Sequence, residues 1–490
     1  MQSIKTLKIN FLLILKLLII ANVLFLLVYE THIKDFILLE IKNNPDPFDR
    51  DYYSSIFQYL EYPIVTTTII LALLLKFRVI IITKITNLQN TKNLLSVVLI
   101  MVFVIQIVLV LLIKNIPFSD SAYYVDLAER LYQTGSYTSE FGFRSAFWPI
   151  GLPAYLALAR FISEDYLLLV KFLNILFYLT LIVVTYKLFS EQLSKKALVV
   201  FLICFSFFPN NLFSANIILT DYPFSLLVWI CIFITIKYPL RKAVIVGVLL
   251  ALSSYLRPVG LLLPFLIILY YFKSYGIKPS LKYSGIILAV FILILSPWII
   301  RNYQVFHSFV PVSTNGGLNF LMGNHPNSNG NVNSNFEYDN SNLNEVEESV
   351  NAYNNGFKSI IDDPLQAIVR SFKKIMFAYI RGDSSITWSL KQTENKLSPI
   401  FLSYVFFFTN YFFYVIIFLS FFSFYSMFRK DNSKLKSILI YVYIFFISMI
   451  LIYVGSERYL IPILPIHFLL FSDFMDKSGV DEVKIIESNH

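Results

Sequence analysis

The sequence has few charged residues for its length. They make up 14% of the 490 residues, whereas soluble domains carry roughly 25%. Hydrophobic residues make up 57% of the chain, and they fall in long runs. Together these features exclude a soluble globular protein and predict an integral membrane protein.

Cysteines and histidines are also scarce. Cys204 and Cys231 both lie inside apolar segments, which argues against a disulfide between them. The five histidines show no metal-ligand spacing. Glycine-rich phosphate loops, nucleophile elbows and zinc motifs are absent from the sequence. No standard metalloenzyme or nucleotide-binding signature is therefore present.

The formal net charge of +9 does not indicate a nucleic-acid partner. The lysines and arginines cluster at the ends of apolar runs, where they set membrane topology. We therefore expect membrane lipids, and no nucleic acid, around this chain.

The apolar runs predict an all-α, multi-pass membrane protein with about twelve helices. Several runs are shorter than the ~20 residues of a simple span, so this number is uncertain by one or two. The runs are centred near residues 9–29, 60–77, 95–113, 166–187, 197–210, 222–237, 243–256, 258–272, 283–300, 399–427, 437–455 and 459–472.

The charges between the runs predict an orientation. Residues 30–61 carry seven acidic and three basic residues, whereas residues 76–94 carry basic residues only. Because basic segments stay in the cytoplasm, the first is expected outside and the second inside. Continuing this alternation places 114–164 and 301–396 outside and both termini in the cytoplasm of a plasma (inner) membrane protein, although the C-terminal tail is acidic.

These patterns divide the chain into five parts. Residues 1–94 form an N-terminal membrane hairpin of two helices, and 95–300 form a membrane core that includes a first outer loop, 114–164. Residues 301–396 form a long Asn-rich outer loop with an amphipathic helix near 363–381. The C-terminal membrane helices occupy 397–472, and 473–490 are a cytoplasmic tail. Loops as long as these two outer segments usually carry function.

Five charged residues stand at the predicted outer ends of apolar runs: Asp120, Asp221, Arg257, Arg301 and Arg458. Simpler roles exist for each of them. The acids suit helix N-caps, Arg257 can snorkel to a headgroup, Arg301 can anchor a helix end, and Arg458 can pair with the adjacent Glu457. Ionisable groups at membrane depth are nevertheless functional candidates by default.

One chemistry fits outer carboxylates combined with outer arginines. The arginines hold the phosphate of a lipid-linked sugar, and this phosphate gains charge as it leaves. One carboxylate accepts the proton of the acceptor hydroxyl. Because phosphate leaves without protonation, no general acid is required.

The segment 118–158, FSDSAYYVDLAERLYQTGSYTSEFGFRSAFWPIGLPAYLAL, resembles the first outer loop of polyprenyl-phosphate-sugar-dependent glycosyltransferases with the GT-C fold. These include the protein O-mannosyltransferases and the lipid A aminoarabinose transferases, glycosyltransferase families 39 and 83. Three further segments are similar to the family: 253–264, 299–330 and 457–465. The shared pattern in the first segment is Asp120, Tyr124, Ala128, Gly135, Pro149, Gly151 and Pro153.

The resemblance implies a GT-C membrane bundle with extracytoplasmic amphipathic helices, and an inverting sugar transfer. It places Asp120 as general base, with Asp221 as a second catalytic acid where relatives often have Glu. Arg257, Arg458 and Arg301 would bind the donor phosphate. The substrate loop would include Tyr124, Asn315, Gly316, Gly317 and Asn324. The matched segments contain no Asp-x-Asp pair, so neither an essential divalent metal nor another cofactor is expected.

The expected function is transfer of a sugar from a polyprenyl-phosphate donor to a lipid, glycan or protein acceptor on the extracytoplasmic face. A lipid-linked-sugar flippase or multi-pass transporter is the alternative from another class, but it should place paired charges near mid-membrane and use compact loops. A glycan polymerase or ligase that uses the same kind of donor also fits. The sequence names neither the sugar nor the acceptor.

Overall fold

The computed structural model describes residues 11–43, 46–86, 91–238, 241–332, 340, 343–428 and 433–487. Several predicted features lie outside these residues. They are the N-terminus (1–10), part of the Asn-rich stretch (333–339 and 341–342), parts of three basic segments (87–90, 239–240 and 429–432) and the last three residues of the tail (488–490).

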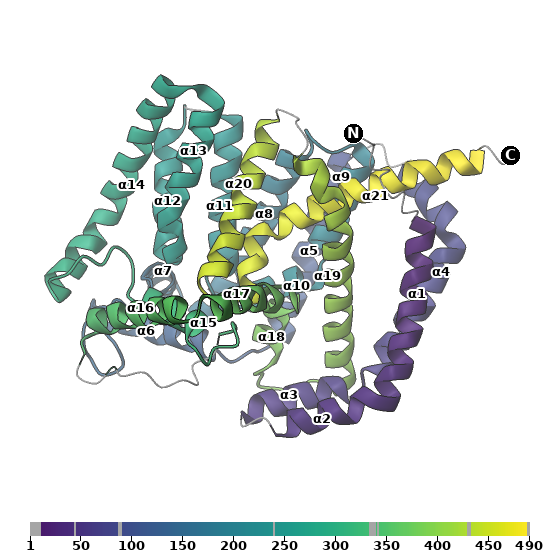
Figure 1. Cartoon of the computed structure of the whole chain (residues 1–490), viewed down its shortest axis with the longest axis horizontal. Helices are drawn as coiled ribbons and strands as arrows, with labels where there is room; N and C mark the ends of the chain where they lie inside the picture. The colour runs from purple at the N-terminus through teal and green to yellow at the C-terminus, as the bar shows by residue number, and fades with distance from the viewer. Residues whose placement is uncertain are drawn as a thin grey trace.

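The described chain is all helical, with three isolated β-bridges and no strand. Figure 1 shows a bundle of long helices with shorter helices lying across one end. The helices in chain order are α1 (Phe11–Val28), η1 (Tyr29–Ile33), α2 (Lys34–Lys42), α3 (Pro47–Phe57), α4 (Glu61–Thr86), α5 (Thr91–Leu112), α6 (Asp120–Thr134), α7 (Gly151–Ile162), α8 (Tyr166–Phe189), α9 (Lys195–Ser206), α10 (Pro209–Leu212), η2 (Phe213–Asn216), α11 (Asp221–Lys237), α12 (Ala243–Leu256), η3 (Pro258–Leu262), α13 (Leu263–Tyr275), α14 (Ile277–Phe306), α15 (Gly316–Asn324), α16 (Glu345–Asp362), α17 (Pro364–Tyr379), α18 (Ser384–Leu390), α19 (Pro399–Phe428), α20 (Lys434–Ile452), η4 (Glu457–Ile463) and α21 (Leu464–Glu487).

Each of the twelve predicted apolar runs coincides with a helix or a helix pair. Within the described residues, 8 helices are long and apolar enough to cross a membrane, or up to 10 if each of two bent pairs counts as one span. The bends, of 46° and 57°, separate α3 from α4 and α9 from α10 and η2. The two remaining runs are α11 and α12, with 17 and 14 residues. The upper of these counts lies within the predicted number of about twelve, uncertain by one or two.

The three predicted outer segments gather at one end of the bundle. In Figure 1, α2 and α3, α6 and α7, and α15 to α18 lie along the lower end of the long helices. The turn between α13 and α14 lies at the opposite, upper end. The arrangement of the segments relative to one another therefore agrees with the charge-derived topology.

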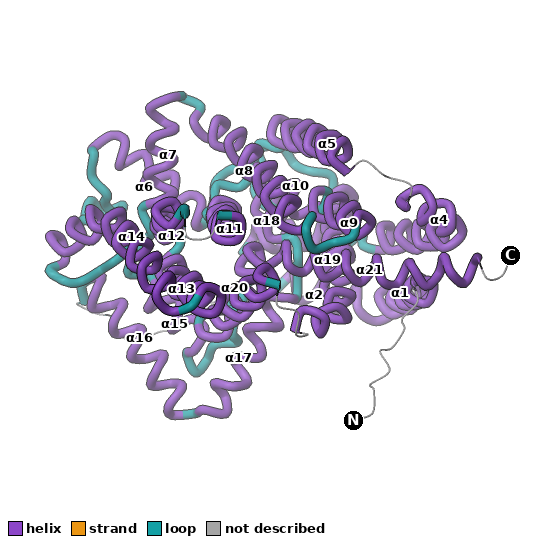
Figure 2. Tube along the Cα trace, turned by 90° about the horizontal axis from the view of Figure 1, so that it is seen from above, coloured by secondary structure: helices purple, strands orange, loops and turns teal. Residues whose placement is uncertain are grey.

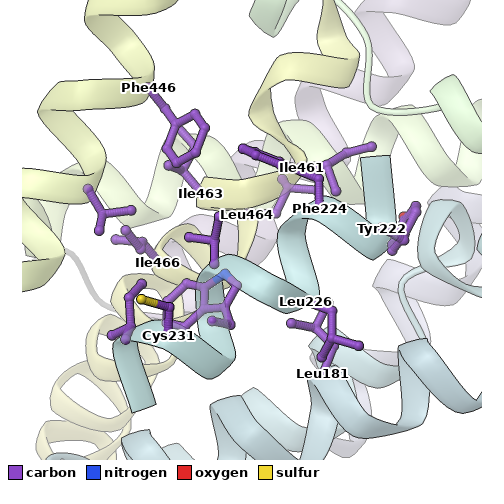
Figure 3. Packing of buried hydrophobic residues seen from close by; sticks show 14 of the residues in the cluster. Leu181, Tyr222, Phe224, Leu226, Cys231, Phe446, Ile461, Ile463, Leu464 and Ile466 are labelled. Carbon is purple, nitrogen blue, oxygen red and sulfur yellow. The ribbon is translucent and has the colours of Figure 1, made fainter. Parts of the chain in front are cut away.

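The interior of the bundle is packed with large apolar side chains. Figure 3 shows α11, α20 and the η4–α21 segment meeting through Phe224, Phe446, Ile461 and Leu464. Trp229 is fully buried in the same cluster, and its indole N–H donates to the carbonyl oxygen of Pro462 at 3.0 Å. This packing holds the start of α11 and the η4 segment in a fixed relation.

The long outer segment contains an amphipathic helix, α17, whose buried side is charged and whose exposed side is apolar. α16 and α17 meet at a tip that extends beyond the bundle in Figure 2. α17 buries Arg370 and Lys374 against the protein and exposes an apolar stripe on its opposite side. The stripe comprises Leu365, Ile368, Val369, Phe372 and Met376. A helix in water would present the reverse distribution.

Candidate active site

Four of the predicted residues, from four distant segments, meet at one place. Asp120 is the first residue of α6, Asp221 is the first residue of α11, Arg257 lies between α12 and η3, and Arg458 lies in η4. Their side chains form a continuous set of ion pairs. We call these four residues the Asp–Arg cluster.

Asp120 follows a strained residue. Ser119 has φ 47° and ψ −130°, a conformation that costs a non-glycine residue of order 1–3 kcal/mol. The hydroxyl of Ser121 fixes the turn, since it donates to the carbonyl oxygen of Phe118 at 2.7 Å and accepts from the backbone N–H of Phe118 at 2.9 Å. The turn thus sets Asp120 at the helix start with its carboxylate directed to Arg458.

Arg458 links the two acids. Its Nη1 donates to Oδ2 of Asp120 at 2.8 Å, and its Nη2 donates to Oδ2 of Asp221 at 3.1 Å. The guanidinium also lies over the Trp388 ring, with Cζ 5.0 Å from the ring centroid. Three neighbours therefore hold this side chain, which is only 15% exposed.

Arg257 reaches the cluster from an irregular segment. Pro258 ends α12, because a proline disfavours helical geometry at the residue before it, and Arg257 is extended. Its Nη2 donates to Oδ1 of Asp221 at 2.6 Å and its Nε to Oγ1 of Thr220 at 3.0 Å. The break in the apolar run is thus what directs this arginine to Asp221.

The two acids differ in their surroundings. The Asp221 side chain is 1% exposed and pairs with both arginines, whereas the Asp120 side chain is 28% exposed and pairs with Arg458. Burial on its own would raise the pKa of Asp221, but Arg257 and Arg458 outweigh burial and hold this pKa below its usual value. Asp221 is therefore ionised and weakly basic, and Asp120 is the more accessible carboxylate.

The structure argues against two of the simpler roles, helix capping by the acids and pairing of Arg458 with Glu457. Neither Ser119 nor Thr220 makes a side-chain cap, and neither acid occupies the N-cap position of its helix. The ion-pair partners of Arg458 are the two cluster acids instead of Glu457. Capping and local pairing are thus not what these residues do in this structure.

Arg301 lies apart from the cluster. Its Nη1 and Nη2 each donate at 2.8 Å, to the carbonyl oxygens of Ser145 and Tyr137 respectively. It also lies over the Trp298 ring, with Cζ 4.8 Å from the centroid. These contacts fasten the loop between α6 and α7 to the end of α14, and the structure does not bring Arg301 together with the cluster arginines.

Tyr124 lies one helical turn after Asp120 on α6. Its ring is buried and packs edge-on against Trp148, with centroids 5.2 Å apart. Burial raises the pKa of its hydroxyl, and the charge of Asp120 adds to this effect. The residue therefore stays neutral and forms part of the wall behind Asp120.

Four of the five predicted substrate-loop residues lie in the short helix α15 or directly before it. Gly316 and Gly317 begin α15, and a Cβ on Gly317 would lie 2.0 Å from the carbonyl oxygen of Ser349 in α16. Asn315 accepts from Ser313 at 2.9 Å. The amide group of Asn324 bonds Ile452 and Lys374, each at 2.9 Å. The contacts of Gly317 and Asn324 hold α15 against α16, α17 and α20, and none of the contacts given is to the Asp–Arg cluster.

Sequence reasoning missed Trp388 and Thr220, both of which contact the cluster arginines. Because Thr220 directly precedes Asp221 in the chain, the sequence could have predicted that Thr220 lies near the cluster. Trp388 lies in α18, in the long outer segment, and no local pattern marks it. Its ring also stacks on Phe118 with centroids 4.6 Å apart.

An apolar groove of about 620 Å³ borders the cluster. It runs between α7, α8, α11, α12 and α14. Pro223 and Leu226 line it two and five residues after Asp221, and Leu256 lines it next to Arg257. The arrangement therefore offers two guanidinium groups and an accessible carboxylate at the edge of an apolar groove. Among the described residues, no group of three or more His, Cys, Asp or Glu is placed to hold a metal ion.

No protein-family model and no curated protein matches the sequence. Three solved structures show a partial likeness. An oligosaccharyltransferase from Archaeoglobus fulgidus has a TM-score of 0.47 and 13% identity in its apo form, over 81% of this chain and 52% of its own. The same enzyme tethered to an acceptor peptide with an NVT sequon has a TM-score of 0.45 and 14% identity, over 79% and 49%.

The third is ArnT from Cupriavidus metallidurans in the apo state, with a TM-score of 0.36 and 11% identity, over 78% of this chain and 77% of its own. This chain spans about half the length of the oligosaccharyltransferase chains it matches. All three TM-scores lie below 0.5.

Proposed function

We propose that this protein is a GT-C-type membrane glycosyltransferase of the plasma (inner) membrane. It transfers a hexose or pentose from a polyprenyl-phosphate donor to a lipid, glycan or protein acceptor on the extracytoplasmic face, with both termini in the cytoplasm. The observation that carries the proposal is the Asp–Arg cluster at the edge of an apolar groove.

The two arginines suit the phosphate of the donor. Guanidinium groups bind phosphate through paired N–H donors, and Arg257 and Arg458 direct theirs into one small volume around Asp221. A donor phosphate entering this volume competes with the carboxylates for these donors. As the phosphate leaves it gains negative charge, so the arginines bind it more tightly in the transition state than in the ground state.

Asp120 suits the role of general base. It is the more exposed acid, and only Arg458 of the two arginines pairs with it. In an inverting displacement, the acceptor oxygen bonds to the anomeric carbon while the bond from that carbon to the phosphate oxygen breaks. The acceptor proton passes to Asp120, and the bonding electron pair leaves with the polyprenyl phosphate.

Asp221 takes a positioning role in this scheme. Its carboxylate is buried between both arginines, and its lowered pKa makes it a poor proton acceptor. It holds the two guanidinium groups near each other despite their mutual repulsion. This revises its expected role as a second catalytic acid.

The groove suits the lipid part of the donor. Ligand cavities typically measure about 300–1,000 Å³ and are mostly apolar, and this groove has apolar walls and about 620 Å³ of space. Its lining residues Pro223 and Leu256 are close in sequence to Asp221 and Arg257, which supports a chain lying in the groove with its phosphate at the cluster.

A flippase or transporter fits these observations less well. Such proteins place paired charges near mid-membrane, whereas the cluster lies at the start of α6 and α11 near one end of the bundle. A polymerase or ligase would use the same donor chemistry with a glycan-lipid acceptor.

The test is a transfer assay with purified protein in liposomes and a panel of polyprenyl-phosphate sugars, with mass analysis of the acceptor. Asp120→Asn should lower the rate by about 10²–10⁴-fold. Asp126→Asn is the matched control, because Asp126 lies on the same helix, is 48% exposed and pairs with Arg130. Equal rates for Asp120→Asn and wild type would refute the general-base role. Movement of labelled lipid between leaflets without transfer would favour the flippase.

A further inference from the structure

The short helix α3 belongs to the N-terminal module, residues 1–94, which precedes the segments that resemble the glycosyltransferase family. One face of α3 contacts the long outer segment. Asp49, Tyr52, Tyr53 and Ile56 follow the i, i+3, i+4, i+7 spacing that places residues on one side of a helix. All four contact residues 381–402. The face therefore combines charge, hydrogen bonding and apolar packing.

The charged part of this face is directed at Lys391. The Nζ of Lys391 lies 2.6 Å from Oδ1 of Asp49 and 3.3 Å from Oδ2 of Asp46. Lys391 is only 12% exposed, so these pairs are better shielded from water than a surface ion pair. Lys391 directly follows α18, and the two acids fix that end of the helix.

The hydrogen-bonding part reaches the other end of α18. Nη1 of Arg381 donates to the hydroxyl of Tyr53 at 2.6 Å. The same arginine donates to Asp383 at 2.8 Å and 3.1 Å and to the hydroxyl of Thr387 at 2.8 Å. Asp383 is completely buried. This network links α3 to the residue before α18 and to the helix itself.

The apolar part lies between these two contacts. Tyr52 and Ile56 are buried together with Ile386 and Leu390 of α18 in a cluster separate from the main core. α18 has seven residues, too few for an isolated helix to be stable in water. Its position therefore depends on its neighbours. Ser385 and Ser389 bond it to α10, η2 and α11, and α3 adds contacts to the residues that flank it and shares its apolar cluster.

The side of α18 that bears Trp388 carries the link to the Asp–Arg cluster. Trp388 stacks on Phe118 at 4.6 Å with an interplanar angle of 13°, and Arg458 lies 5.0 Å above its ring. Lys391 itself lies 5.5 Å from the Phe118 ring centroid. Phe118 is two residues before Asp120. Arg458 thus lies against Trp388, and Asp120 follows Phe118 closely in the chain. Trp388 belongs to α18, and Phe118 contacts both Trp388 and the lysine after α18, which α3 contacts in turn.

We propose that α3 is a positioning element of the active site. It fixes α18, and α18 in turn sets Trp388 beneath the guanidinium of Arg458 and against Phe118. This inference rests on the proposed function for its catalytic consequence, while the coupling from α3 to α18 stands on the contacts alone. It assigns a role to a module that the family resemblance does not cover.

The test removes the polar contacts of α3 and leaves its fold intact. The double variant Asp49→Asn/Tyr53→Phe is compared with Glu61→Gln, which breaks the pair between Lys34 and Glu61 at 3.2 Å elsewhere in the same module. Amide exchange of residues 384–391, donor kinetics and thermal stability are measured for both. We expect about tenfold faster exchange and a roughly tenfold lower kcat/KM for the donor in the double variant only.

A conservative variant tests whether the carboxylate at position 49 is the group that matters. Asp49→Glu in an otherwise wild-type chain keeps a carboxylate for Lys391, so exchange and donor use should stay as in wild type. Unchanged exchange in the double variant would overturn the inference, and so would faster exchange with wild-type kinetics, because α18 would then not position the site.

The experiment also separates this inference from the proposed function. If wild-type protein transfers no sugar from any donor, the proposed function fails, and binding of polyprenyl phosphate replaces kinetics as the readout. Weaker binding by the double variant together with faster exchange would support the positioning role. Unchanged binding would refute it.

Discussion

Arg458 and Asp120 form an ion pair at 2.8 Å across 338 residues of sequence. The same guanidinium contacts Asp221, so one side chain connects the start of α6 with the start of α11. Without a donor, the pair neutralises the carboxylate proposed as base. Under the proposed function, a donor phosphate that draws the guanidinium toward itself would free Asp120 for the acceptor proton. Donor binding and base availability would then be coupled through this one residue.

Replacing Arg458 by lysine tests the phosphate role. Lysine keeps the charge but lacks the planar fork that binds two acceptors. Arg458→Lys should lower kcat/KM for the donor about thirtyfold, since hydrogen bonds to charged groups contribute about 2 kcal/mol.

Arg301→Lys is the matched control, because Arg301 bonds the carbonyls of Tyr137 and Ser145 away from the cluster. It should lower thermal stability and leave donor KM unchanged. A larger kinetic defect in Arg301→Lys than in Arg458→Lys would reverse the assignment.

Replacing Asp221 by asparagine leaves two arginines without their shared counter-charge. Breaking a buried pair typically costs about 3–5 kcal/mol, so Asp221→Asn should unfold at a clearly lower temperature in detergent. Donor affinity should fall with it because the guanidinium groups separate. Full stability combined with lost transfer, measured on the same preparation, would instead mark Asp221 as the proton acceptor.

Filling the apolar groove tests the lipid site. Leu226 lines the groove on α11, and Leu226→Trp places a larger side chain there. Donor KM should rise for long polyprenyl chains and much less for a short-chain analogue, whereas kcat should change little. Leu176→Trp, on the exposed side of α8 at 51% exposure, is the control. An equal KM change for long and short donors would place the chain elsewhere.

The sequence predicts the helices and the core of the site for physical reasons. Apolar runs must become helices in lipid, because every backbone group has to be paired internally. Four of the five charged residues at the outer ends of these runs meet, since the run ends share one level of the bundle. The exact number of spans depends on the short helices α11 and α12 and on the two bends, which apolarity alone does not reveal.

The remaining positions depend on tertiary contacts that no local pattern encodes. Arg301 stands at a helix end like the other arginines, but backbone carbonyls of the α6–α7 loop occupy it. Gly317 suggests a flexible loop, and instead it allows α15 to approach α16 closely. Trp388 lies in the long outer segment and reaches Arg458 only because α18 folds back onto the bundle.

The apolar stripe of α17 should contact lipid. Ile368 and Phe372 are 54% and 69% exposed, whereas the buried side of the helix holds Arg370 and Lys374. Helices of this type lie in the membrane interface. Ile368→Trp and Phe372→Trp should be quenched by brominated lipids in liposomes, and Lys373→Trp, on a different side, should be quenched much less. Equal quenching by an aqueous quencher at all three positions would place the helix in water.

Lys374 gives the α17 region a distinct pH dependence. Its side chain is fully buried, and its Nζ donates to Asn324 at 2.9 Å and to the carbonyl oxygens of Leu451 and Ile452 at 3.0 and 3.2 Å. Burial, with the nearby charge of Arg370, lowers the pKa of Lys374 from 10.5 to about 8.

Between about pH 8 and 10.5, the unfolded chain therefore binds a proton that the folded chain has lost. Across that window the contribution of Lys374 to the free energy of unfolding rises with pH, by no more than about 3 kcal/mol. Below about pH 8 both states are protonated and the contribution is constant. Other lysines and tyrosines titrate over the same range, so the measurement is the difference between wild type and Lys374→Met in thermal unfolding at pH 7.5 and 9.5. We expect the unfolding temperature of wild type to rise relative to that of Lys374→Met as the pH rises. A constant difference would show that the three carbonyl acceptors hold the ammonium form at its ordinary pKa.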